Sequence, residues 1–242
     1  MIKPNITIFF PVYNDEQTVK IVAEKAVKFA QEYAKDYEII IINDKSPDSS
    51  GKIADELAKK NPKIKVIHHN KNLGYGAAIK SGLYAANYEI ICFTDGDDEY
   101  DIMDFKRMLK LYEFYDLIIT FRYKKIYSSK RILISYIYNI LLRWLFRTNY
   151  RDISTGMRLI RKSMLEELVL NTDSPFIGAE ITIKAMLNGF RVGEMGIQTF
   201  PRKIGSGSAT SVKNIILTIK DVYKVYKEIF SDNYNLPENR KR

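Results

Sequence analysis

Cysteine is almost absent from this sequence, because Cys92 is the only one in 242 residues. A single cysteine excludes an intramolecular disulfide, and this usage is typical of a reducing compartment. Since Cys92 stands in an apolar segment, we expect it to be a core residue and not a nucleophile. The fold must therefore be held by buried apolar side chains, and 46% apolar residues are enough for a core in a chain of this length.

Long hydrophobic runs are missing as well. No apolar run reaches the roughly 18 residues that a membrane-spanning helix needs. The N-terminus leads directly into a predicted strand, so we expect no secretory signal peptide. Disorder over most of the chain is also excluded, because 28% charged residues is usual for a globular protein.

Acidic residues are fewer than basic ones, 29 against 38, and the formal net charge is +9. The basic excess falls in residues 124–161 and in the tail, residues 237–242. Such regions predict an anionic partner, which can be a phosphate group, a nucleic acid or a lipid surface.

What the sequence does have is a repeated alternation of apolar strands and helical segments. The strands predicted from this alternation cover residues 6–10, 38–43, 64–67, 89–93 and 116–120, with a further strand at 193–200. The second strand shows no polar alternation, as expected for a strand covered on both faces. We therefore predict an α/β fold with a mostly parallel sheet and right-handed crossovers.

Helical periodicity separates these strands and dominates the C-terminal third. The predicted helices cover residues 18–33, a segment ending near 60, 77–86, 101–111, 132–146, 163–170, a segment from 178, and 213–230. Asn14 or Asp15 is the expected cap of the first helix. Residues 152–158 are expected to form a polar loop.

Four carboxylates follow the fourth strand within five residues: Asp95, Asp97, Asp98 and Glu99. Their mutual repulsion is costly unless a cation lies among them, and hard carboxylate oxygens suit Mg²⁺ or Mn²⁺. Gly96 lets the backbone turn so that Asp95 and Asp97 can face one ion. The alternative is an acidic turn that caps the helix starting near Asp101.

The unusual polar segments of the first half all follow strand ends: residues 13–16, 44–48 and 95–99. In an open α/β sheet ligands bind outside the carboxyl ends of the strands, so these segments predict a nucleotide-type site. The Gly74-Tyr75-Gly76 turn offers a helix N-terminus to a phosphate. Ile79 stands where a dinucleotide fingerprint requires its third glycine, which disfavours a dehydrogenase.

Three segments of the second half leave alternatives open. The helix at 132–146 has basic flanks and Trp144, and it is either an interfacial helix or an ordinary core helix. Residues 201–208 form either a phosphate-binding loop or a solvated surface loop. The basic amphipathic helix at 213–230 either packs on the domain or lies on an anionic bilayer.

With these segments in place, the sequence resembles the family 2 glycosyltransferases of the GT-A fold. More narrowly, it is similar to their polyprenyl-phosphate branch, the dolichol-phosphate mannosyltransferase and dolichyl-phosphate glucosyltransferase types. The resemblance extends over nearly the whole chain, in residues 11–16 (P-x-Y-N-E), 43–48 (D-D-x-S-x-D), 70–82 (N-x-G-x-G-A…G), 95–99 (D-x-D-x-Q), 152–161 (D-x-x-x-G-F-R-x-x-R) and 202–208 (R-x-G-x-S). Three features depart from the pattern: Asn43 replaces an Asp, Glu99 replaces a Gln, and no transmembrane helices follow.

The resemblance implies an inverting, metal-dependent hexosyl transfer from a nucleoside-diphosphate sugar of the GDP-mannose or UDP-glucose type. Mg²⁺ or Mn²⁺ would be held by Asp95 and Asp97, with Glu99 as an additional ligand, and would neutralise the leaving diphosphate. Asp44 would accept hydrogen bonds from the base. The full set of implied donor-binding residues is Pro11, Tyr13, Asn14, Glu16, Asp44, Asp48, Gly74, Gly76, Lys80, Asp95 and Gly96.

On the acceptor side, the resemblance implies a polyprenyl phosphate bound by an enzyme lying peripherally on the cytoplasmic, inner face of a membrane. A phosphate oxygen is already nucleophilic, so basic residues would hold it and not deprotonate it. The residues implied as catalytic are Asp97, Asp152 and Arg202, and those implied in acceptor binding are Arg131, Arg158, Glu180, Lys203 and Ser206. Glu180 has the alternative role of complementing a helix dipole.

Two other functions stay open from the sequence. A family 2 transferase that extends a glycan would need a base such as Asp152 or Glu180. A non-enzymatic module would bind a membrane or nucleic acid, although the acidic cluster would repel nucleic acid and we expect no nucleic-acid partner. The oligomeric state is also open, a homo-oligomer included. We expect residues 1–121 to bind the donor, 122–210 to bind the acceptor, and 211–242 to form the basic helix and tail.

Overall fold

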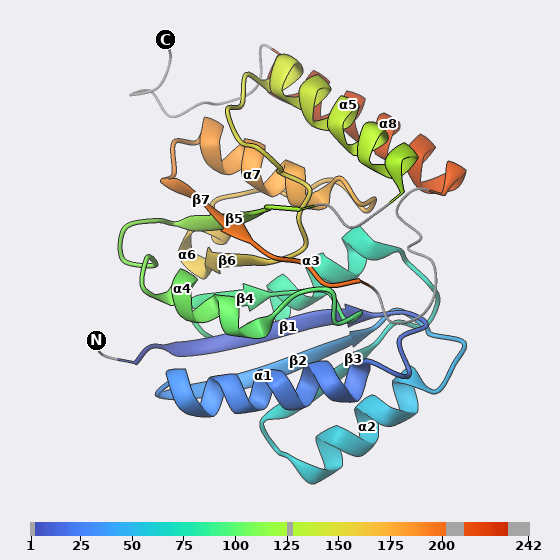
Figure 1. The fold of residues 1–242 in the computed structure, drawn as a ribbon, viewed down its shortest axis with the longest axis vertical. Helices are drawn as coiled ribbons and strands as arrows, with labels where there is room; N and C mark the ends of the chain where they lie inside the picture. The colour runs from blue at the N-terminus through green and yellow to red at the C-terminus, as the bar shows by residue number, and fades with distance from the viewer. Residues whose placement is uncertain (1–2, 125–127, 202–210, 232–242) are drawn as a thin grey trace.

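The computed structural model describes residues 3–124, 128–201 and 211–231. Within them the strands form one sheet in the order β3-β2-β1-β4-β6-β5-β7 (Figure 1). The strand bounds are β1 (Asn5–Val12), β2 (Asp36–Asn43), β3 (Ile64–His68), β4 (Ile90–Phe93), β5 (Leu117–Arg122), β6 (Arg158–Arg161) and β7 (Val192–Ile197). All neighbours are parallel except β6, which is antiparallel to β4 and β5. The predicted α/β fold is therefore confirmed.

The strands are apolar throughout because both faces of the sheet are covered. On β2, Ile39 and Ile41 pack into one hydrophobic cluster, and Ile40 and Ile42 pack into the other. The first cluster contains residues of α1 (Val19–Tyr33), α2 (Ser50–Lys60) and α4 (Phe105–Leu109), the last preceded by a 3-10 turn, η1 (Ile102–Asp104). The second contains residues of α3 (Tyr75–Ala85), α5 (Ser129–Phe146), α6 (Lys162–Glu166), α7 (Ile177–Leu187) and α8 (Val212–Ile229).

Several sequence predictions need correction. Residues 158–161 form β6 and not the end of a polar loop, because Leu159 and Ile160 are buried while Arg158 and Arg161 pair with Phe93 and Ile90 of β4. The helices predicted at 101–111 and 163–170 are shorter, ending at Leu109 and Glu166. The N-cap of α1 is Thr18, whose hydroxyl donates to the Gly96 carbonyl at 2.7 Å.

The helices α5 and α8 lie side by side at the end of the molecule farthest from α2 (Figure 1). Phe146 of α5 and Tyr226 of α8 have ring centroids 6.1 Å apart. One face of α5 is core, with Leu142 and Phe146 buried, while its other face is exposed, so the core reading is confirmed for one face and the interfacial reading stays a prediction. In the part of the chain that the structure describes, no helix has the length and hydropathy to cross a membrane.

Candidate functional site

The carboxyl ends of three neighbouring parallel strands carry the predicted polar segments. β1 lies between β2 and β4, with Val12 paired to Asn43 and Phe9 paired to Phe93. The segments that follow these strands therefore meet at one edge of the sheet, which we call the acidic edge (residues 13–16, 44–48 and 95–99). The sequence prediction that they converge is confirmed.

The loops after β1 and β2 are joined by reciprocal hydrogen bonds. The Glu16 N–H donates to the Asp48 carboxylate at 3.0 Å, and the Ser49 N–H donates to the Glu16 carboxylate at 3.1 Å. The Asn14 N–H donates to the Ser46 hydroxyl at 3.3 Å. Glu16 and Asp48 therefore shape the loops, while the Tyr13 side chain is 43% exposed and stands at their surface.

Backbone strain is concentrated at this edge. Of the four non-glycine residues with positive φ in the described chain, three lie here: Asn14 (60°), Lys45 (57°) and Asp98 (60°). Such conformations cost free energy and persist where the surrounding structure enforces them, often at ligand sites. The loops after all three strands are thus held in unusual shapes.

The four carboxylates of the acidic cluster have different surroundings. Asp95 accepts a hydrogen bond from the Tyr75 hydroxyl at 2.7 Å, and Asp97 accepts one from the Glu99 N–H at 3.1 Å. Asp98 forms an ion pair of 2.5 Å with Lys25 of α1. Burial, and next the Asp95 carboxylate, raise the pKa of Tyr75, so its hydroxyl stays a donor at neutral pH. Asp98 is thus held by a lysine of α1.

The metal ligands predicted from the resemblance need one correction. Among the described residues, no group of three or more His, Cys, Asp or Glu side chains is arranged to hold a metal ion, so Asp95, Asp97 and Glu99 do not form a three-ligand site. Mg²⁺ commonly uses one or two carboxylates and completes its shell with substrate phosphates and water. Asp97 is buried and Asp95 is half-buried, and their hard oxygen donors fit that kind of shared site.

Gly96 and Pro11 bring the first strand against this cluster. A Cβ at position 96 would lie 2.5 Å from the Pro11 carbonyl oxygen, so only glycine permits this approach. Pro11 is buried inside β1, which continues to Val12, whereas the predicted strand ended at residue 10. Both residues set the backbone of the acidic edge.

Asp44 has a role that the sequence did not predict. Its carboxylate accepts from the N–H groups of Leu73 and Gly74, both at 2.8 Å, and lies 2.7 Å from Nδ1 of His69. With 4% of its surface exposed, Asp44 fixes the loop before α3. The Asp44 oxygens are engaged by these internal donors, so the expected hydrogen bond from a nucleobase to Asp44 is not supported.

The Gly74-Tyr75-Gly76 turn was expected to bind a phosphate, but the N–H groups of both glycines donate to acceptors within the protein. The Gly74 N–H donates to Asp44, and the Gly76 N–H donates to the Asp173 carbonyl at 2.9 Å. Lys80 forms an ion pair of 2.6 Å with Asp173. These donors are therefore used to attach α3 to residue 173, and the phosphate assignment of the turn and of Lys80 is not supported.

Two predicted acceptor-binding residues are inside the protein. Arg158 is fully buried and donates to Ile153, Thr155 and Thr182, and burial lowers its pKa to about 10, so it stays charged at neutral pH. Glu180 is also fully buried, accepts from the Asn171 and Thr172 N–H groups, and pairs with Lys184 at 2.8 Å. Neither side chain is exposed, so direct acceptor binding by these two residues is not supported.

Asp152 is buried and paired with Arg122. The guanidinium of Arg122 donates to Asp152 Oδ2 at 2.7 and 3.0 Å, and the Ser154 hydroxyl donates to Oδ1 at 2.8 Å. Both carboxylate oxygens of Asp152 are thus engaged by donors of the protein itself. The pairing of Asp152 with Arg122 was not foreseen.

Of the other residues predicted to bind the acceptor or to act in catalysis, the structure describes only some. Arg131 lies in the first turn of α5 and is half-buried. Arg202, Lys203 and Ser206 lie outside the described residues. The chain just before them runs beside the acidic cluster, because the Phe200 N–H donates to the Glu99 carbonyl at 2.9 Å.

Sequence reasoning missed Tyr75, His69 and Lys25 as partners of the edge carboxylates. Tyr75 stands between two glycines of a quoted motif, and that position is a signal that could have been used.

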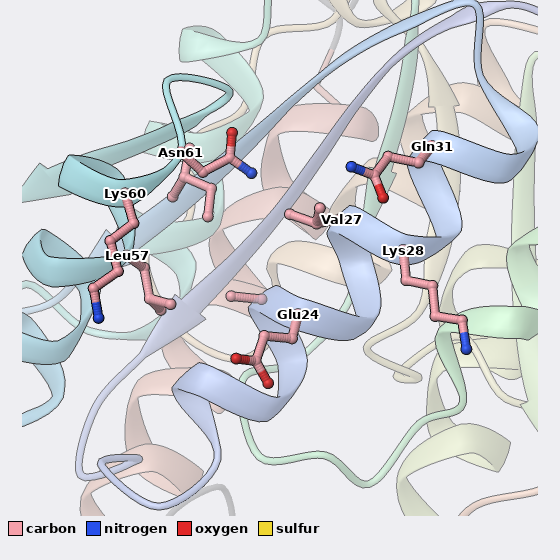
Figure 2. A pocket seen from close by; sticks show the side chains of 9 residues that line it. Glu24, Val27, Lys28, Gln31, Leu57, Lys60 and Asn61 are labelled. Carbon is pink, nitrogen blue, oxygen red and sulfur yellow. The ribbon is translucent and has the colours of Figure 1, made fainter.

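A separate pocket lies away from the acidic edge. Figure 2 shows this pocket between α1 and α2, lined by Val27, Leu57 and Asn61 among others. Its lining includes Ile64, the first residue of β3, so it opens toward the amino ends of the strands.

Comparison with known proteins adds to this geometry. Residues 7–169 match the model of the family described as "Glycosyl transferase family 2". The chain is 27% identical over 211 residues to the polyprenol monophosphomannose synthase of Mycolicibacterium smegmatis, an alignment covering 82% of this chain and 78% of that protein. It is 24% identical over 221 residues to the glycosyltransferase AglD of Haloferax volcanii, covering 87% of this chain but only 35% of that protein.

A solved structure shares the fold. Glucosyl-3-phosphoglycerate synthase from Mycobacterium tuberculosis, in complex with Mn²⁺, UDP-glucose and phosphoglyceric acid, superposes with a TM-score of 0.69 at 14% identity. The match covers 90% of this chain and 79% of that one. The GT-A fold expected from the resemblance is thereby confirmed.

Proposed function

This chain belongs to glycosyl transferase family 2, and we propose that it transfers a hexose from a nucleoside-diphosphate sugar onto a polyprenyl phosphate at a membrane surface. Family membership makes the chain a glycosyltransferase and leaves the non-enzymatic module without support. The donor of GDP-mannose or UDP-glucose type, the lipid acceptor and the peripheral position on the cytoplasmic face are the content of the proposal.

The acidic edge would receive the donor. Asp95 and Asp97 would hold Mg²⁺ or Mn²⁺ together with the diphosphate of the donor. When bound, the cation supplies positive charge that stabilises the departing nucleoside diphosphate. Tyr13, Asn14 and the strained loop after β2 border the edge and would bind the nucleoside. A single displacement by the acceptor oxygen inverts the anomeric centre.

The observation that carries the lipid acceptor is the outward face of α5. Every exposed residue that the structure describes between Arg131 and Phe146 is apolar, and together they are Leu133, Ile134, Tyr136, Ile137, Ile140, Leu141 and Trp144. Soluble proteins seldom expose a contiguous apolar surface of this kind unless it binds something. A polyprenyl chain and the bilayer around it offer the matching chemistry.

The helix α8, which contacts α5 through Tyr226 and Phe146, has an exposed apolar row of its own and adds charge. One row of its exposed side chains is apolar, at helical spacing: Val212, Ile216, Ile219, Tyr223 and Tyr226. A second exposed row is basic: Lys213, Lys220, Lys224 and Lys227. Apolar residues flanked by lysines are typical of helices that lie in the interface of an anionic bilayer. We therefore place α5 and α8 on the membrane.

The surroundings of Asp152 and Glu180 favour a phosphate acceptor over a glycan hydroxyl. A hydroxyl needs a general base within reach, but Asp152 is paired with Arg122 and Glu180 lies in the interior. A phosphate monoester oxygen carries negative charge at neutral pH and needs no base. The acceptor chemistry that demands least of these residues is therefore the lipid phosphate.

A transfer assay tests the proposal. Purified protein with Mn²⁺ receives radiolabelled GDP-mannose or UDP-glucose and either polyprenyl phosphate in liposomes or a soluble oligosaccharide. We expect label in the organic phase with the lipid acceptor alone, and none with Asp97→Ala. Transfer to the oligosaccharide, with no transfer to any polyprenyl phosphate, would contradict the proposal.

Membrane contact is tested by co-sedimentation with anionic liposomes. Ile137→Glu places a charge on the outward face of α5 and should reduce binding, as should high salt. Phe114→Glu is the matched control, because Phe114 is 62% exposed and lies outside α5 and α8. Wild-type protein that stays in the supernatant at low salt would exclude this surface as a membrane contact.

A further inference from the structure

We propose that Tyr75 is a positioning residue that fixes the Asp95 carboxylate toward the cation and diphosphate. The inference rests on the proposed function, which assigns Asp95 to that cation. The Tyr75 hydroxyl donates to Asp95 Oδ1 at 2.7 Å, and Tyr75 comes from α3 while Asp95 follows β4. The hydrogen bond therefore joins two separate elements across the acidic edge.

Gly156 restricts the same carboxylate from another side. A Cβ at position 156 would lie 2.1 Å from Asp95 Oδ2, so the carboxylate packs directly on the glycine backbone. The Gly156 N–H in turn donates to the Tyr100 hydroxyl at 3.1 Å. One carboxylate oxygen thus contacts a hydroxyl and the other contacts a glycine, which leaves Asp95 little freedom to turn.

The start of α3 is held by contacts with residues outside the helix, and these contacts fix the position of the Tyr75 side chain. A Cβ at Gly76 would lie 2.4 Å from the backbone carbon of Asp173, and the Gly76 N–H donates to the carbonyl of that residue. On the other side of Tyr75, the Gly74 N–H donates to Asp44. Both neighbours of Tyr75 are therefore bound to elements outside the helix.

The terminal torsion of an aspartate is broad, so its carboxylate plane is set by partners and not by an intrinsic rotamer. When two carboxylates share one cation, the orientation of each decides how many oxygens reach it. Loss of partners that orient metal ligands typically weakens metal affinity by about 10–100-fold. We expect an effect of this size, near its lower limit, for removal of the Tyr75 hydroxyl.

The chain offers a matched control at the other end of the sheet. The Tyr88 hydroxyl donates to Asp36 Oδ2 at 2.7 Å, the same donor, acceptor type and distance as in the Tyr75 pair. Tyr88→Phe therefore removes an equivalent hydrogen bond without touching the acidic edge. Any effect seen for Tyr75→Phe alone belongs to the site.

The experiment measures Mn²⁺ binding by calorimetry in the presence of UDP or GDP, with no acceptor and no turnover. Tyr75→Phe should weaken Mn²⁺ binding about tenfold, and Gly156→Ala should weaken it as well by displacing the carboxylate. Tyr88→Phe should bind Mn²⁺ as the wild type does. In an Asp95→Asn background, Tyr75→Phe should cause no further loss.

The outcomes separate the two proposals. Wild-type protein that binds no Mn²⁺ with either nucleotide overturns the proposed function and the role of Tyr75 with it. Normal wild-type binding, with an unchanged value for Tyr75→Phe, overturns only the role of Tyr75. A tenfold loss that persists undiminished in the Asp95→Asn background would show that Tyr75 acts elsewhere, and it too would contradict the proposal.

Discussion

The two ends of the sheet differ in the backbone that carries their carboxylates. At the amino end, Asp36 is paired with Lys63 at 2.5 Å and Glu38 with Lys65 at 2.7 Å, on regular strands. At the carboxyl end, Asp95 accepts from a tyrosine hydroxyl, and the loops around it hold three residues at positive φ. Asp36 also accepts from the Tyr88 hydroxyl, and Asp98 at the carboxyl end pairs with Lys25, so the two ends differ in backbone conformation more than in the kind of partner. We read the first end as stabilising and the second as functional.

The two carboxylates of the amino end have lowered pKa values. The Lys63 ammonium, then the Tyr88 hydroxyl and the Tyr37 N–H, lower the pKa of Asp36 to about 2. Burial alone would raise the pKa of Glu38, but hydrogen bonds from Lys65, Asn87 and Thr7 outweigh it and bring the pKa below its usual value. The amino end is therefore charged over the whole neutral and weakly acidic range without any ligand.

The largest expected effect is a loss of turnover caused by a substitution at the carboxyl end of the sheet. Asp97→Ala removes a carboxylate from a loop and should reduce turnover at least about 10²–10³-fold, the usual result of removing a group that organises transition-state charge. The fold should survive, because the change lies outside the strands. Turnover with Mn²⁺ and the thermal midpoint check both parts. Full activity of the variant in excess chelator would refute the metal assignment.

Asp44→Ala would sharpen the comparison, because Asp44 lies at the carboxyl end but is bonded like a stabilising residue. The N–H groups of Leu73 and Gly74 would lose their acceptor, so we expect the free energy of unfolding to fall by about 3 kcal/mol. Urea unfolding measures it. Unchanged stability with a specific loss of nucleotide affinity would return Asp44 to the nucleobase.

Glu38→Ala applies a similar change at the amino end. Glu38 is 4% exposed, and its loss leaves Thr7 and the Asn87 N–H without an acceptor, while the half-exposed Lys65 can be solvated. We expect about 2 kcal/mol of destabilisation and unchanged turnover per folded molecule. A large loss of turnover at full stability would mean that the two ends are not separate.

The smallest expected effect is a pH dependence of stability. Asp36 has a lowered pKa of about 2 in the folded state, against roughly 3.9 in the unfolded chain. Its contribution is therefore present above about pH 4 and is lost as pH falls toward about 2. Asp36→Asn should flatten the thermal midpoint over this range. A wild-type midpoint that stays constant there would contradict the pairing with Lys63.

Sequence patterns predicted the parallel core and the position of the edge because both depend on apolar periodicity. They failed for β6, since four residues with arginine at both ends carry no strand signal and its partners are distant in sequence. They also assigned Arg158 and Glu180 to acceptor binding, whereas both side chains are fully buried. The i,i+4 spacing of Glu180 and Lys184 indicates an ion pair, but only packing shows that the pair is buried.

The sequence patterns did not predict which side chain each carboxylate contacts. Motif spacing placed Asp44 at the correct edge, yet its bonds to Leu73 and Gly74 depend on how the loop before α3 closes. Tyr75 was quoted as part of a turn, and its reach to Asp95 follows from the attachment of α3 to residue 173. Such contacts join separate elements and have no local pattern.

The insertion of β6 between β4 and β5 bears on the order in which the protein folds. β1, β2 and β3 are each joined to the next strand by one crossover, whereas the pairing of Ile6 with Ile90 and that of Ile90 with Arg161 both close long loops. Closing such loops is entropically slow, so we expect β1 to β3 to gain structure before β4 and β6 join them. Gly156 and Asp173 arrive only with the second half, so the site itself matures late.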